Sequence, residues 1–133
     1  MSFFWGEAGK KMSLTHIQRL YAEIDSSYDA GNLGSATYQF AADVIQLLDP
    51  DEQDFDVVAH AKELQGMSIE ELTEFRREDL EEWERDEPGV LSRRFEVGDG
   101  QTFSSLNQLI ECTDFTYIKE DLLAMYLGEK PIP

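Results

Sequence analysis

Cysteine, histidine and long apolar runs are scarce in this sequence of 133 residues. The single cysteine, Cys112, excludes an internal disulfide and fits a reducing compartment, so we expect a cytoplasmic protein. Its neighbours Leu109, Ile110 and Phe115 predict that the thiol is buried as a small apolar group. No run of about 18 apolar residues is present, so no membrane span is expected. The aromatic start of the chain is short and lacks basic residues, so no signal peptide is expected either.

Sequence motifs for catalysis, metal binding and cofactor binding are also missing. The chain has no P-loop, no G-x-G-x-x-G, no G-x-S-x-G and no pair of metal-spaced histidines or cysteines. Asp49 and Asp51 begin like a calcium-binding EF-hand loop, but Asp54 replaces the required glycine and His60 the terminal glutamate. We therefore predict no enzyme activity, no catalytic residue, no metal site and no cofactor. A small hydrolase or calcium-binding protein is kept only as a third interpretation.

The residues that are present predict one compact, acidic domain over 1–133. Eight Phe, five Tyr and two Trp are enough to build a core. Periodic apolar residues predict a mainly α (α+β) fold with about five or six helices. The first two helices, over 13–28 and 35–48, are joined by a glycine-containing break and form an N-terminal αα-hairpin. Ser13 or Thr15 is expected to cap the first helix.

The following segments are assigned by their capping and turn signals. Asp49 and Pro50 predict the start of a well-buried third helix that runs to Gln65, with Gly66 as its C-terminal glycine. Ser68 with Glu71 is a capping box that opens a fourth helix ending near Asp86. A small β-hairpin is expected near residues 91–103, with the basic pair at 93–94 on a strand edge, followed by helices from 105 and over 116–127.

Acidic residues are concentrated in one part of the chain. With 28 acidic and 11 basic residues, the net charge is −17. Residues 49–88 hold sixteen acids and four bases, whereas residues 1–48 hold five and three. Such a charge disfavours direct binding to nucleic acid or to anionic membranes, since both require basic surface. It favours a basic protein as the partner.

Within the predicted fourth helix, glutamates lie opposite the apolar side, and we call them the glutamate row: Glu70, Glu71, Glu74, Glu78, Glu81 and Glu82. Residues four apart on a helix are about 6 Å apart, and like charges at this spacing destabilise the helix by a few tenths of a kcal/mol per pair. Arg77 and Arg85 offset part of this repulsion, and Arg76 is expected to pair with Asp79 at the core edge. The ordinary interpretation of such a row is a solvated helix face. The functional one is a partner-binding face.

The functional interpretation predicts a non-enzymatic, acidic protein-binding inhibitor. A rod of carboxylates imitates a phosphate backbone, and acids at Asp51, Glu52, Asp54, Asp56 and Glu63 are expected to add to it. Such a nucleic-acid mimic would occlude the basic surface of a nucleic-acid-binding protein or a nuclease. Phage anti-restriction and anti-CRISPR inhibitors and immunity proteins work in this way, and the analogy is one of charge and size alone.

The alternative is a helical adaptor or assembly protein that binds partners through apolar grooves. It is motivated by the helical hairpin and by the aromatic N-terminal segment, which either packs on the core or is an exposed anchor. The sequence leaves the oligomeric state open.

Overall fold

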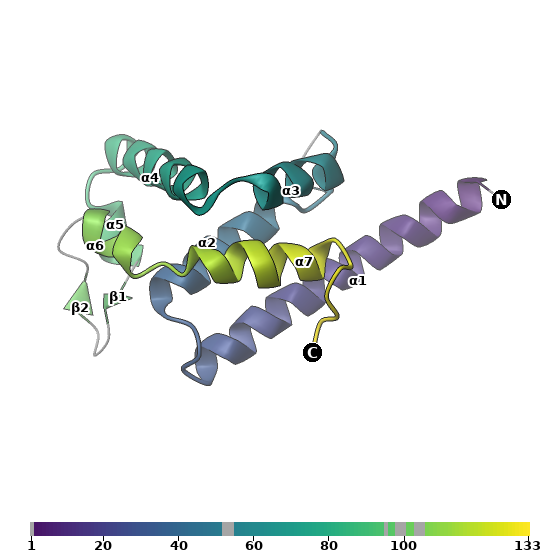
Figure 1. The fold of residues 1–133 in the computed structure, drawn as a ribbon, viewed down its shortest axis with the longest axis horizontal. Helices are drawn as coiled ribbons and strands as arrows, with labels where there is room; N and C mark the ends of the chain where they lie inside the picture. The colour runs from purple at the N-terminus through teal and green to yellow at the C-terminus, as the bar shows by residue number, and fades with distance from the viewer. Residues whose placement is uncertain (1, 52–54, 95, 98–100, 103–105) are drawn as a thin grey trace.

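Helices account for 75% of the protein in its computed structural model (Figure 1). The structure describes the backbone of residues 2–51, 55–94, 96–97, 101–102 and 106–133, and the side chains of residues 15–51, 55–93 and 106–133. The mainly helical class predicted from the sequence is confirmed. Among the described helices, none is both long and apolar enough to cross a membrane.

Helices α1 (Ser2–Asp29) and α2 (Ser35–Leu47) pack against each other as the predicted αα-hairpin. Gly31 makes the turn between them with a φ of 81°, a conformation that favours glycine. The predicted start of α1 at Ser13 or Thr15 is wrong, because the helix already runs from Ser2. The segment before Ser13 includes Ala8, Lys10 and Lys11, which are good helix formers, so a capping pattern there does not interrupt the helix.

Helix α3 (Val57–Gly66) begins later than the sequence predicts. The carboxylate of Asp56 accepts from Ala59 N at 3.1 Å and caps the helix. Asp49 instead accepts from Asp51 N at 2.9 Å and closes a local turn. Gly66 lies inside the helix and is not a C-terminal cap. The expected burial holds for Ala61 and Leu64, which are fully buried, but is wrong for Phe55 and Val58, which are 48% and 46% exposed.

Helix α4 (Ile69–Asp86) has the predicted bounds, but the segment after it differs from the prediction. Val90–Arg94 forms a short helix, α5, that buries the adjacent Val90 and Leu91. The hairpin expected near 91–103 is therefore not supported. Among the described residues, antiparallel pairing joins β1 (Glu96–Val97) to β2 (Gln101–Thr102). Arg93 lies on α5 and pairs with Glu87 at 3.1 Å, so it does not protect a strand edge as predicted.

The C-terminal part of the chain contains α6 (Leu106–Glu111), a π-helical segment η1 (Tyr117–Leu122) and α7 (Leu123–Tyr126). The predicted helix over 116–127 is thus helical, with its first half in the wider π form. Four successive residues, 122–125, are buried, which shows that this helix is enclosed on most sides. Cys112 follows α6 and is exposed, so its predicted burial is wrong. The nearby Leu109 and Ile110 take the buried positions.

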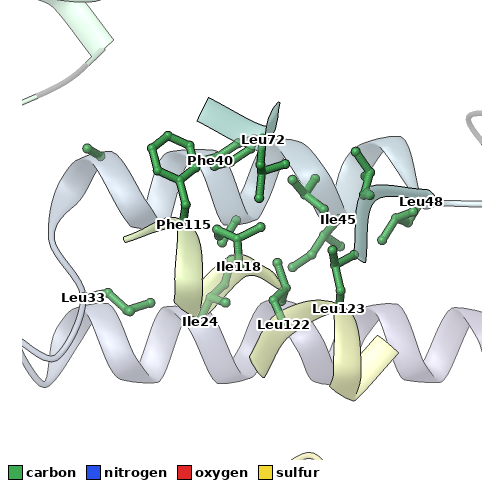
Figure 2. Close-up of a cluster of buried hydrophobic side chains, with 14 of the residues drawn as sticks. Ile24, Leu33, Phe40, Ile45, Leu48, Leu72, Phe115, Ile118, Leu122 and Leu123 are labelled. Atoms are coloured by element: carbon green, nitrogen blue, oxygen red, sulfur yellow. The ribbon is translucent and has the colours of Figure 1, made fainter. Parts of the chain in front are cut away.

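Side chains from four helical regions meet in the core (Figure 2). Ile24 comes from α1, Phe40 and Ile45 from α2, Leu72 from α4, and Ile118 and Leu122 from η1. Helices α3 and α4 follow one another along one side of the molecule, while α1 lies on the opposite side (Figure 1). This arrangement gives α4 an inner face that packs against the core and an outer face toward solvent.

Candidate functional site

The N-terminus of α4 is fixed by the predicted capping box. The Ser68 hydroxyl accepts from Glu71 N at 3.1 Å, and the Glu71 carboxylate accepts from Ser68 N at 3.2 Å. Glu70 and Glu71 also lie at the positive end of the helix dipole, where acids are stabilising. The start of the glutamate row therefore has a structural role, and only part of its acidity needs another explanation.

The inner face of α4 is anchored by Arg76, which is only 1% exposed. Its guanidinium donates to Asp79 on the same helix at 2.9 Å and to Asp43 of α2 at 3.0 Å. It also lies 4.7 Å from the centre of the Phe40 ring. The predicted pair with Asp79 is confirmed, whereas the pair with Asp43 was not predicted. This ion-pair network ties α4 to α2 and fixes the rotation of α4 about its axis.

All six side chains of the glutamate row are exposed to solvent. Within the described part of the chain, the ion pair at the row joins Glu74 to Arg77, with a distance of 3.4 Å between Oε1 and Nε. Glu70, Glu71, Glu78, Glu81 and Glu82 have no ion-pair partner among the described residues. The structure therefore brings the predicted site residues together on one helix, where Glu70, Glu74 and Glu78 follow one another at about 6 Å along its length.

Three of the acids that the sequence added to this surface, Asp51, Asp56 and Glu63, are exposed. Asp56 lies close to Tyr126. Glu52 and Asp54, which the sequence added to the same surface, lie outside the described residues. Glu84 is half-buried and accepts from Gly89 N at 2.6 Å, so it serves the turn after α4.

A second surface was missed by sequence reasoning. We call it the α1–α3–α7 groove: His16, Val58, Tyr126 and Leu127 line a cavity of about 150 Å³. The rings of His16 and Tyr126 meet edge to face at 5.6 Å, and the Tyr126 hydroxyl donates to Leu48 O at 3.2 Å. Burial raises the pKa of Tyr126, and the nearby carboxylates of Asp49 and Asp56 raise it further. The groove thus combines the apolar side chains of Val58 and Leu127 with the rings of His16 and Tyr126, and acidic residues lie close by.

One polar atom in the groove is left over. His16 Nε2 is shielded from solvent and has no hydrogen-bond partner among the described residues. Buried polar atoms are normally paired, so this nitrogen is free to accept a hydrogen bond from a group that enters the groove. The sequence analysis did not find this groove because it predicted that Val58 is buried, and a buried residue cannot line a surface groove.

No cluster of three or more His, Cys, Asp or Glu side chains suited to a metal ion occurs among the described residues. Comparisons of the chain with protein-family models, with curated proteins and with solved structures gave no match.

Proposed function

We propose that the protein is a non-enzymatic inhibitor that occludes a basic, nucleic-acid-binding or nuclease surface of a partner protein. The observation that carries this proposal is the exposed glutamate row, set on a helix that Arg76 fixes in place. Five of its six carboxylates have no ion-pair partner within the described residues, and one of these, Glu71, accepts a hydrogen bond from Ser68 N. A charged surface of one sign steers association with a partner of the opposite sign.

The rigidity of α4 supports binding over simple solubility. A solvated face needs charge but no fixed spacing, whereas a mimic of a phosphate backbone needs charges held at constant intervals. The capping box fixes the start of the helix and the Asp43–Arg76–Asp79 network fixes its rotation, so the helix that carries the carboxylates needs no further ordering. Preorganisation of this kind lowers the entropic cost of association.

Charge reversal tests the proposal against a matched control. The site variant is Glu74→Lys with Glu78→Lys and Glu81→Lys, and the control reverses the exposed acids Asp29, Glu111 and Glu120. Each triple variant moves the net charge from −17 to −11, so overall charge is equal. We expect the site variant to lose roughly 30- to 100-fold in affinity for a partner captured from nuclease-treated lysate, and the control to lose under about threefold. Equal losses in the two variants contradict a specific role for the row.

The alternative function, a helical adaptor that binds through apolar grooves, is favoured by the exposure of Phe55 and Val58. Deleting residues 1–5 or replacing Val58 with Asp should then abolish partner binding without unfolding the protein, while charge reversal on α4 has little effect. Val58→Asp and the charge reversal on α4 therefore distinguish the adaptor function from the inhibitor function.

A further inference from the structure

The α1–α3–α7 groove lies where α1 leaves the body of the protein. His16 belongs to α1, Val58 to the first turn of α3, and Tyr126 and Leu127 to the end of the last helix. Figure 1 shows that α1 runs on past the ends of α3 and α7 toward the N-terminus. The first half of α1 therefore extends beyond the residues that line the groove.

The extending half of α1 combines the helix formers Ala8, Lys10 and Lys11 with two glycines. Residues 2–14 contain Gly6 and Gly9, and glycine disfavours helix interiors. Helices of this length are marginal in water without a surface to pack on. The segment also places Trp5, Gly9 and Met12 in one stripe with His16, because eleven residues from 5 to 16 make close to three full turns.

Charge favours contact at this end of the molecule. Residues 2–14 hold one acid and two bases, Glu7, Lys10 and Lys11, and so have a net charge of +1 in a protein of net −17. The groove has Asp49 and Asp56 near Tyr126. The N-terminal segment is thus complementary in charge to the groove, and residues 1–48 as a whole carry only five acids against three bases.

We propose that two copies of the protein associate by antiparallel, two-fold pairing of their α1 helices, with Trp5 of each copy seated in the α1–α3–α7 groove of the other. A two-fold axis that passes between residues 10 and 11 places position 5 of one copy opposite position 16 of the other. It also places Met12 of one copy opposite Gly9 of the other. The indole N–H is a donor, and His16 Nε2 is the groove atom that needs one. The contact is isologous and closed, so it yields a dimer and no larger assembly.

The mass in solution tests this pairing. One chain weighs 15.2 kDa, and sedimentation equilibrium should show a concentration-dependent approach to twice that mass. Trp5→Ala and Val58→Asp should each weaken the dimer at least about 30-fold, as expected for loss of a buried aromatic anchor or its pocket. Trp5→Phe, which keeps the ring but lacks the N–H, should fall between the wild type and Trp5→Ala.

Ile69→Asp is the matched control. Ile69 is 41% exposed and Val58 46%, both changes replace a β-branched residue with an acid, and Ile69 lies on α4. Ile69→Asp should leave the dimer intact, and circular dichroism should show both variants folded. A wild-type chain that stays monomeric, or a dimer that Val58→Asp and Ile69→Asp affect equally, overturns the proposal.

Discussion

Replacing Arg76 with alanine should destabilise the protein by about 3 kcal/mol, the lower end of the cost of breaking a buried ion pair. The size of this loss depends on how well the two aspartates are solvated once the guanidinium is removed. The side chain of Asp43 is 16% exposed and would keep its charge beside Phe40 with no guanidinium, whereas Asp79 is 37% exposed and regains water. Asp43→Ala should therefore cost more than Asp79→Ala, for which a surface pair predicts about 0.5 kcal/mol.

Urea unfolding followed by far-UV circular dichroism measures all three variants. A loss of about 3 kcal/mol lowers the melting temperature of a domain this size by about 10 °C. A loss below about 1 kcal/mol for Arg76→Ala would refute the buried network as the anchor of α4. The same conclusion follows if Asp79→Ala is the more damaging of the two aspartate changes.

Three further predictions concern other parts of the molecule. Asp56→Ala should cost about 1 kcal/mol through loss of the α3 cap, and Asp49→Ala clearly less, as measured by urea unfolding. The hydrogen bond to Asp25 raises the pKa of Tyr38 to about 12, so its stabilising effect is complete below about pH 10 and is lost as the pH rises through 12; the deficit of Tyr38→Phe should shrink over that range, and a constant deficit contradicts this. Cys112 is exposed, so a thiol reagent should modify the native protein within about tenfold of the rate in denaturant, and full protection would show burial instead.

The sequence predicted those parts of the fold whose signals are local. The capping box at Ser68 and Glu71 set the start of α4, and glutamates placed opposite Leu72 and Leu80 are exposed because one helix period decides both faces. The start of α3 was missed because Asp49 and Asp56 both fit an N-cap, and the rest of the chain decides between them. The contact of Asp43 with Arg76 was not predicted, since nothing in the neighbours of Asp43 reveals that Arg76 reaches it from 33 positions away.

The prediction for the segment after α4 was wrong for a different reason. Val90 and Leu91 are followed by polar residues in a pattern short enough to suit a strand or a single helical turn. Burial of two adjacent side chains against the core selects the helix. The groove at Val58 was missed for the same reason: whether a short apolar run is buried depends on which other parts of the chain pack against it.

The most direct test of the central claim is whether the glutamate row competes with nucleic acid. A basic nucleic-acid-binding partner is loaded with a fluorescent DNA duplex, and the protein is titrated in while anisotropy is followed. The account predicts that the protein and the control triple variant release the duplex, that the Glu74, Glu78 and Glu81 reversal does not, and that release weakens steeply as salt rises. Release that is equally effective with the reversed row, or that is insensitive to salt, contradicts it.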